Sequence, residues 1–206
     1  MKIFSFEGIE GVGKSTQINL LKDYLEINGY STEILREPGS TITGESIRSI
    51  LLDSKENLSS ESELLLMFAA RAQLISEKVN NSNSDIILFD RFYDASLAYQ
   101  GFGRNLPIDF IHSLITFINC PEPRLTFLLD ISVQDGFERK VNDVKDRIES
   151  AGNEFFQKVR EGYLDIAKNN QNRIKVIDAM QSIDDINKSK VMDSIRKMNE
   201  LYETMI

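Results

Sequence analysis

The residues best suited to chemistry begin near the N-terminus, in the segment GIEGVGKS at residues 8–15, which follows a short apolar run and opens a helical pattern. Glycines let successive backbone N–H groups turn toward one point, and the start of a helix adds partial positive charge there. Lys14 can reach the outer phosphates of a nucleotide, and the hydroxyl of Ser15 can coordinate Mg²⁺. The segment is therefore predicted to be a P-loop that binds a nucleoside triphosphate. We expect this ligand to be contacted by Gly8, Ile9, Glu10, Gly11, Val12, Gly13, Lys14, Ser15 and Thr16.

A second group of polar residues follows the apolar run at residues 85–89. Asp90 ends this run, where a carboxylate can complete the magnesium site of the P-loop. Arg91 comes next, and ligands of doubly wound folds lie at the carboxyl ends of the strands. A helical turn after it can present further polar side chains to one pocket, although this pattern alone is also typical of an amphipathic helix with a structural ion pair. These side chains are Ser96, Tyr99 and Gln100.

Two further segments indicate a second, anionic ligand. The segment REPGST places Arg36 at the end of another apolar run, and its Pro-Gly pair turns the chain sharply. The segment ELLLMFAARAQL is a helical pattern that brings Met67, Phe68 and Arg71 within about one turn of each other. An aromatic ring beside a guanidinium can stack on a base and hydrogen-bond its carbonyl, whereas most leucines here are typical core residues. Because an unpaired buried arginine is costly, Arg71 amid apolar residues favours a binding role over plain core packing.

Apolar runs alternate with longer helical patterns along the whole chain. Strands are predicted at residues 3–6, 32–35, 85–89, 125–129 and 174–177. Helices are predicted at residues 14–28, 44–52, 60–80, 107–119, 153–170 and 183–205. This alternation predicts an α/β fold, a P-loop NTPase three-layer sandwich with a parallel sheet of five strands flanked by helices. A chain of 206 residues without repeats or linkers suits a single domain over residues 1–206.

The charge and cysteine content of the chain limit its partners and its compartment. A net charge of -8 argues against nucleic acid or an anionic membrane as a partner, since both require a basic face. The single cysteine, Cys120, cannot form an internal disulfide, which suits a reducing compartment. No apolar run approaches the length needed to span a membrane. We therefore expect a cytoplasmic protein that acts on small molecules.

A P-loop by itself leaves switch GTPases, ATPase motors and small-molecule kinases open. The guanine-reading pattern N-K-x-D does not occur in the sequence. A motor or nucleic-acid ATPase would need a basic track, which the acidic composition does not offer. The remaining segments favour a kinase with a small anionic acceptor.

Taken together, the segments resemble the thymidylate kinase family in their order along the chain. They are FEG with the P-loop, REPG, FAAR, DRFYDASLAYQGFGR and DRIE, and the resemblance covers about residues 3–180. P-loops are widespread, but REPG together with DR…S…AYQG is far more specific, and shikimate, gluconate and dephospho-coenzyme A kinases share the fold without this set. The resemblance implies transfer of the γ-phosphoryl group of ATP to dTMP, giving dTDP and ADP, with Mg²⁺ as cofactor. It also implies a homodimer.

The resemblance assigns roles to the matched residues. Arg36 and Arg91 are expected to clamp the phosphate of dTMP, and Arg71 to contact the thymine carbonyl. The family's stacking side chain lies four residues before this arginine, at Met67, while Phe68 lies three before it, so that either can face the base. The other residues implied around the acceptor are Glu10 near the 3′-hydroxyl, Tyr99 against the 2′ position, and Ser96 and Gln100 around the base.

A mobile lid is expected to supply the basic group at the transferring phosphoryl. Some relatives carry that arginine inside the P-loop, where this chain has Gly11, and the bacterial-type members use a lid instead. The candidate lid is GFERKVNDVKDRIES at residues 136–150, although such a charged run is also typical of a solvated helix. Its Arg147, within DRIE, is expected to act on the phosphoryl. The catalytic residues expected are Lys14, Arg91 and Arg147.

Two alternatives remain open from the sequence. A related kinase could share these segments and phosphorylate a nucleotide with another base. A nucleotide-binding regulator could keep the P-loop without turnover, although the presence of Lys14, Asp90 and Arg91 speaks against it.

Overall fold

The computed structural model describes residues 2–140 and 146–196, and its centre is a parallel sheet of five strands in the order β2-β3-β1-β4-β5. The strands are β1 (Lys2–Glu7), β2 (Thr32–Arg36), β3 (Ile86–Asp90), β4 (Leu125–Asp130) and β5 (Ile174–Asp178). All four strand pairs are parallel. The predicted five-stranded parallel sheet is confirmed, and each strand begins and ends within one residue of its prediction.

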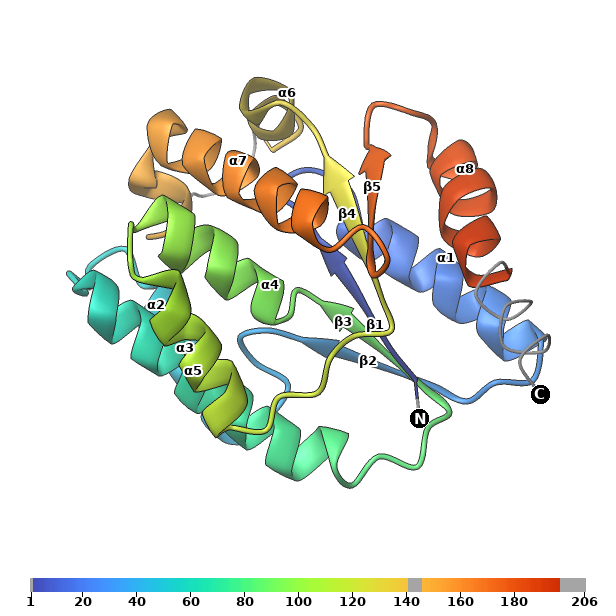
Figure 1. Ribbon diagram of the computed structural model, residues 1–206, viewed down its shortest axis with the longest axis horizontal. Helices are drawn as coiled ribbons and strands as arrows, with labels where there is room; N and C mark the ends of the chain where they lie inside the picture. The colour runs from blue at the N-terminus through green and yellow to red at the C-terminus, as the bar shows by residue number, and fades with distance from the viewer. Residues whose placement is uncertain (1, 141–145, 197–206) are drawn as a thin grey trace.

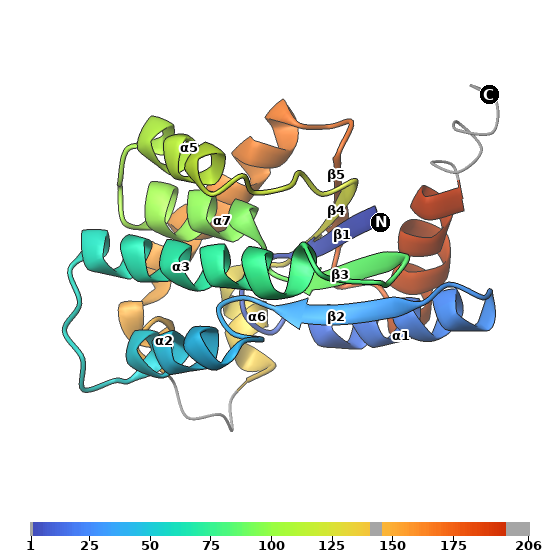
Figure 2. The same ribbon diagram turned by 90° about the horizontal axis from the view of Figure 1, so that it is seen from below.

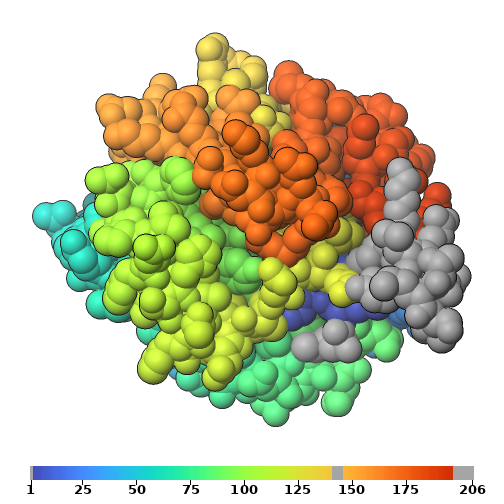
Figure 3. All heavy atoms as spheres, in the orientation of Figure 1, coloured from blue at the N-terminus to red at the C-terminus, as the bar shows by residue number. Residues whose placement is uncertain are grey.

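The central strands are buried on both faces, which explains why they read as continuous apolar runs. Ile87, Leu88 and Phe89 of β3 are fully buried. In β1, Phe6 lies opposite Phe127 of β4, and the two ring centroids are 5.0 Å apart. The space-filling view shows how completely helices cover the sheet on one side, where only a narrow dark-blue strip of the N-terminal strand is visible (Figure 3).

The helices follow the predicted alternation. They are α1 (Lys14–Ile27), α2 (Ile42–Leu52), α3 (Ser60–Leu74), α4 (Tyr93–Ser96), α5 (Ile108–Phe117), α6 (Val133–Glu138), α7 (Asn153–Asn169) and α8 (Ile183–Ile186). Shorter or wider turns are η1 (Ile75–Val79), η2 (Leu97–Gly103), η3 (Glu149–Ala151) and η4 (Asn187–Met192). None of the described helices is long and apolar enough to cross a membrane.

The two faces of the sheet carry different helices (Figures 1 and 2). Helix α1 packs with α8 and η4 on one face. Helices α3, α4 and α7, with η2, cover the other face, and α2 packs against α3. This division follows from right-handed crossovers, because the chain moves one way along the sheet from β1 to β2 and the opposite way in every later connection.

Local capping explains where the helices depart from their predicted bounds. The hydroxyl of Thr41 accepts a hydrogen bond from the Gly44 backbone, so α2 begins two residues before its predicted start at residue 44. The predicted helix at residues 60–80 is α3 continued by the π-helical turn η1. The predicted helix at residues 183–205 is observed as α8 and η4, and its end lies outside the described residues.

Candidate active site

A cavity of about 480 Å³ opens at the carboxyl ends of the strands, where the segments after β1, β2 and β3 meet. The turn after β1 supplies residues of the P-loop, and the turns after the other two strands supply charged side chains. Helices α3 and η2 form the opposite wall. The predicted residues that line this cavity are Glu10, Gly11, Val12, Gly13, Lys14, Ser15, Thr16, Arg36, Arg71, Asp90, Arg91, Ser96, Tyr99 and Gln100.

The turn after β1 has the geometry of a phosphate-binding loop. Gly8 and Gly13 have φ values of 132° and 88°, which residues with a side chain rarely adopt. Lys14 begins α1, and its Nζ donates to the carbonyls of Gly8 at 3.3 Å and Ile9 at 3.0 Å. Burial and the nearby Arg91 guanidinium lower the pKa of Lys14 to about 8. The lysine is thus held inside the loop, where an anion would favour its protonated form.

Ser15 and Asp90 meet at the edge of this loop. The Ser15 hydroxyl donates to Asp90 Oδ2 at 3.1 Å, which joins the start of α1 to the end of β3. Hydroxyl and carboxylate oxygens are the donors that Mg²⁺ prefers, and Mg²⁺ bound with a nucleotide takes most of its remaining ligands from phosphates and water. The donor set at this position therefore fits a nucleotide-bound Mg²⁺ ion.

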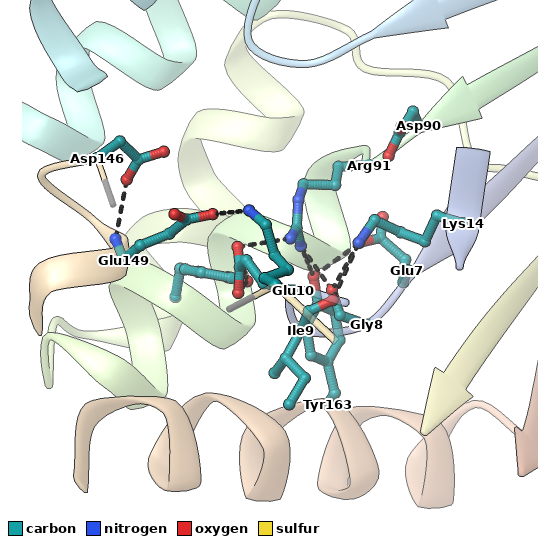
Figure 4. Close-up of polar contacts among 12 residues, drawn as sticks. Glu7, Gly8, Ile9, Glu10, Lys14, Asp90, Arg91, Asp146, Glu149 and Tyr163 are labelled. Carbon is teal, nitrogen blue, oxygen red and sulfur yellow. Dashed lines mark hydrogen bonds and ion pairs between the residues drawn. The ribbon is translucent and has the colours of Figure 1, made fainter. Parts of the chain in front are cut away.

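Arg91 lies at the centre of the site, with its backbone at a φ of 65°. This left-handed conformation is uncommon for an arginine and is typical of a residue that the surrounding structure holds in place. Its Nη1 donates to the Gly8 carbonyl at 2.7 Å, and its Nη2 donates to Glu10 at 2.8 Å. The guanidinium also lies 4.9 Å from the ring centroid of Tyr99. Figure 4 shows Arg91, Glu10 and Lys14 converging around the loop.

A buried carboxyl group that was not predicted from the sequence is linked to Arg91 through the Tyr163 hydroxyl. Glu7 is fully buried, and burial together with Asp94 raises its pKa to about 8. It accepts hydrogen bonds from the Phe92 backbone at 2.7 Å and from the Tyr163 hydroxyl at 2.8 Å. The same hydroxyl accepts a hydrogen bond from Arg91 at 3.2 Å. No spacing in the sequence connects Tyr163 of α7 with the P-loop, so only the fold shows this support.

Arg71 forms the far end of the cavity and is paired, as its burial requires. Its side chain is 2% exposed, and its Nε donates to Glu37 Oε2 at 2.7 Å. Its Nη1 donates to the Ser96 hydroxyl at 3.1 Å. Burial raises the pKa of Glu37, while the charge of Arg71 lowers it. The ion pair fixes the guanidinium on the cavity wall beside Ser96.

The two candidates for stacking on a base are separated by the structure. Phe68 is 3% exposed and does not line the cavity, and the Arg71 guanidinium lies 4.7 Å from its ring centroid. Met67 does line the cavity. The cation–π contact explains the placement, because the ring packs beneath the arginine. Met67, and not Phe68, therefore lies at the surface of the cavity, and contact of either side chain with a base stays a prediction.

Two arginines lie on the side of the cavity formed by the segment after β2. Arg36 donates to Glu45 at 2.8 Å and is about half exposed. Arg48 of α2, which sequence reasoning missed, donates to the Pro38 carbonyl at 3.0 Å. Burial and the neighbouring Arg36 lower the pKa of Arg48. Such a group of mutually repelling cations is stabilised by an anionic ligand.

Arg147 does not line the cavity, and its expected catalytic role stays a prediction. Its Nη2 donates to Glu63 at 2.7 Å, and its Nε donates to the Leu51 carbonyl at 2.8 Å. The side chain therefore fastens the C-terminal part of the candidate lid to α2 and α3. Residues 141–145 of the candidate lid, with Lys145 among them, lie outside the described residues.

Arg139 and Lys140, directly after α6, line the cavity in its place. Arg139 donates to the Gly11 carbonyl at 3.4 Å and to the Ala179 carbonyl at 3.1 Å, while Lys140 pairs with Glu149. The close approach of α6 to the P-loop depends on glycine. A Cβ at Gly11 would lie 2.0 Å from the carbonyl oxygen of Gly136. Position 11 of the P-loop therefore has no room for a larger side chain in this arrangement.

The parallel sheet, the phosphate loop and the second, arginine-rich end of one cavity define a P-loop kinase. The family model described as thymidylate kinase matches residues 6–189. The thymidylate kinase of Kosmotoga olearia is 41% identical over 201 residues, which cover 96% of this chain and 97% of that protein. The thymidylate kinase of Chlorobium phaeobacteroides is 39% identical over 208 residues, which cover 95% of this chain and 94% of that protein. A crystal structure of thymidylate kinase from Ehrlichia chaffeensis has a TM-score of 0.77 and 32% identity, covering 95% of this chain and 98% of that one. The chain belongs to the thymidylate kinase family.

Proposed function

We propose that this enzyme transfers the γ-phosphoryl group of ATP to dTMP, giving dTDP and ADP. The observation that carries the proposal is the lining of the cavity, which combines a phosphate loop with the Arg71–Ser96–Gln100 wall. Arg91 lies between them, tied to the loop through Gly8. Two nucleotides bound at the two ends would direct their phosphates toward each other at Arg91.

The donor phosphates are assigned to the P-loop. Its backbone N–H groups and the ammonium of Lys14 would hold the β- and γ-phosphates, replacing the carbonyl contacts that the lysine now makes. Ser15 and Asp90 would hold Mg²⁺, which when bound neutralises charge on the donor phosphates. Arg139, between the P-loop and the segment after β5, is assigned to the donor nucleotide.

The acceptor nucleotide is assigned to the other end of the cavity. Arg36, Arg48 and Arg91 would bind its phosphate, while Arg71 would donate to a carbonyl of the base. The acceptor phosphate already carries a nucleophilic oxygen, so no strong base is needed. Rate enhancement then comes from holding the two phosphates in line and from neutralising the charge that develops.

Tyr99 and Glu10 are assigned to the sugar of the acceptor. The Tyr99 hydroxyl donates to both carboxylate oxygens of Glu10 at 3.0 Å, so the ring is fixed against the cavity. A fixed ring leaves little room for a 2′-hydroxyl, in agreement with a deoxyribonucleotide acceptor. The carboxylate of Glu10 would remain available to the 3′-hydroxyl.

A substrate panel tests the proposal. ADP release with ATP and Mg²⁺ is measured with dTMP, dUMP, dCMP and dGMP, and kcat/KM should be highest for dTMP. A higher kcat/KM for dCMP or dGMP would instead assign the enzyme to another base. ATP binding without ADP release from any acceptor would favour the nucleotide-binding regulator.

Three further properties belong to the proposal rather than to the described structure. We expect a single domain whose lid, about residues 136–150, closes over bound nucleotides, a homodimer, and a cytoplasmic location. Exposed apolar side chains on α3 and α5, among them Leu65 and Phe110, offer a surface for the dimer. Sedimentation of the purified protein tests the dimer directly.

A further inference from the structure

A buried carboxylate lies beside the acceptor end of the cavity without lining it. Glu63 of α3 is 1% exposed, and its Oε1 accepts a hydrogen bond from Gln100 Nε2 at 2.9 Å. Its Oε2 accepts from Arg104 at 3.1 Å and from Arg147 at 2.7 Å. Glu63 thus joins a residue of the cavity wall to two arginines that lie outside the cavity.

The surroundings of Glu63 keep it ionised. Burial alone would raise its pKa, but hydrogen bonds from Arg104, Gln100 and Arg147, together with the charge of Arg104, hold the pKa below its ordinary value. An ionised carboxylate can only accept hydrogen bonds, so the NH₂ end of the Gln100 amide is the end that can face it. The contact therefore fixes which way round the amide lies.

The other end of that amide is available to a ligand. Gln100 lines the cavity with Arg71 and Ser96, and within the described residues no hydrogen bond occupies its Oε1. Arg71 offers donors on the same wall. The wall thus presents donors from the guanidinium and one acceptor from the amide.

We propose that Glu63 is a positioning residue that sets the choice of base by holding the Gln100 amide with its oxygen toward the acceptor nucleotide. The proposal rests on the proposed function and extends it to a residue outside the cavity. An amide oxygen matches a pyrimidine with N–H at ring position 3, as in thymine or uracil. It opposes cytosine, which has an acceptor at the same position. A site built for one hydrogen-bonding pattern rejects the opposite pattern strongly, because its buried polar groups are left unpaired.

The variant Glu63→Gln tests this role, with dTMP and 5-methyl-dCMP as the matched substrates. Both nucleotides carry the same methyl group and differ only in the hydrogen-bonding edge of the base. In the variant the Gln100 amide is free to turn over. We expect the ratio of kcat/KM for dTMP to that for 5-methyl-dCMP to fall about tenfold or more, since one misoriented buried hydrogen bond is involved. An unchanged ratio in the folded variant would overturn the proposal.

Two matched controls separate positioning from stability. Arg104→Met and Arg147→Met each remove one ion pair of Glu63 but leave its bond to Gln100. Both should lower the melting temperature and keep the substrate ratio of the wild type. If the substrate ratio fell in Glu63→Gln, Arg104→Met and Arg147→Met alike, in proportion to the stability that each variant loses, Glu63 would be a structural residue only.

A second variant and a double variant complete the test. Glu63→Asp keeps the negative charge that pairs with the arginines, but its shorter side chain withdraws the carboxylate from Gln100. This variant should lower the ratio of kcat/KM for dTMP to that for 5-methyl-dCMP even if Glu63→Gln does not fold. In a Gln100→Met background, Glu63→Asp should have no further effect on the ratio, and an added effect there would contradict action through the amide. Failure of the wild type to phosphorylate dTMP would overturn the proposed function, whereas a wild type specific for dTMP with an unaltered ratio in the variants would overturn only the role of Glu63.

Discussion

Lys14 is held in surroundings that disfavour its charge. Its pKa is lowered to about 8 by burial and by Arg91, although the carboxylates of Asp90, Glu10 and Glu7 act in the opposite direction. The free enzyme therefore begins to lose this proton near pH 8. The phosphates of ATP favour the protonated lysine, so that binding raises its pKa and takes up a proton above that pH.

The affinity for ATP should consequently weaken as the pH rises above about 8. The dissociation constant is expected to increase by up to about tenfold per pH unit, the limit for coupling to one proton. Glu7 titrates in the same range, with a pKa raised to about 8 by burial. Lys14→Arg separates the two groups, because arginine keeps its proton. Calorimetric titration at pH 7, 8 and 9 should show the pH dependence in the wild type and its loss in Lys14→Arg, and an equal slope in both proteins would contradict the assignment to Lys14.

Arg91 is the side chain assigned to the phosphate of the acceptor. Arg91→Ala should raise KM for dTMP by about 10- to 100-fold, because hydrogen bonds to charged groups contribute about 1.5–3 kcal/mol. KM for ATP should change much less. Arg160→Ala is the matched control, since Arg160 pairs with Asp130 and does not line the cavity. A larger rise of KM for ATP than for dTMP would place Arg91 with the donor.

At the scale of elements, we expect the candidate lid to divide two tasks between Arg139 and Arg147, whereas the sequence assigns the catalytic task to Arg147. Arg139, at the end of α6, contacts the P-loop, whereas Arg147 is partly buried and pairs with Glu63. Arg139→Met should raise KM for ATP about tenfold, because a charged contact to the donor is lost. Arg147→Met should chiefly lower the melting temperature, because Glu63 loses a partner. Steady-state kinetics and thermal unfolding of both variants test this division, which a reversed pattern would contradict.

The elements were largely predictable because their signals are local. Apolar runs such as residues 86–89 become strands. Gly8 and Gly13, followed by Lys14 and Ser15 between a strand and a helix, indicate a phosphate loop. From the sequence, the cost of burying an unpaired arginine indicates a ligand at Arg71, and the structure adds an ion pair with Glu37 that the sequence does not predict. The ion pair of Arg147 has no such signal, because its partner Glu63 is distant in sequence and only the packing of α3 brings the two side chains together.

At the scale of the whole molecule, the order of the strands determines the site. With β3 and β4 on either side of β1, the P-loop opens beside Asp90 and Arg91 at the carboxyl edge. The P-loop and the arginine-rich wall therefore belong to one cavity. In the sequence, a P-loop together with REPG and DR…S…AYQG already indicates this arrangement. Contacts between distant elements, such as Tyr163 with Glu7, have no sequence signal and follow only from the fold.

The central claim is that a phosphoryl group is transferred from ATP to dTMP in this cavity, and that Lys14 stabilises the group during transfer. The most direct measurement is chromatographic quantification of dTDP and ADP formed from ATP, dTMP and Mg²⁺ by the wild type and by folded Lys14→Ala. We predict equal amounts of dTDP and ADP from the wild type. The rate of the variant should be lower by at least about 100-fold, because it lacks one charge that stabilises the transition state. ADP without dTDP, or dTDP formed by Lys14→Ala at the wild-type rate, would contradict the claim.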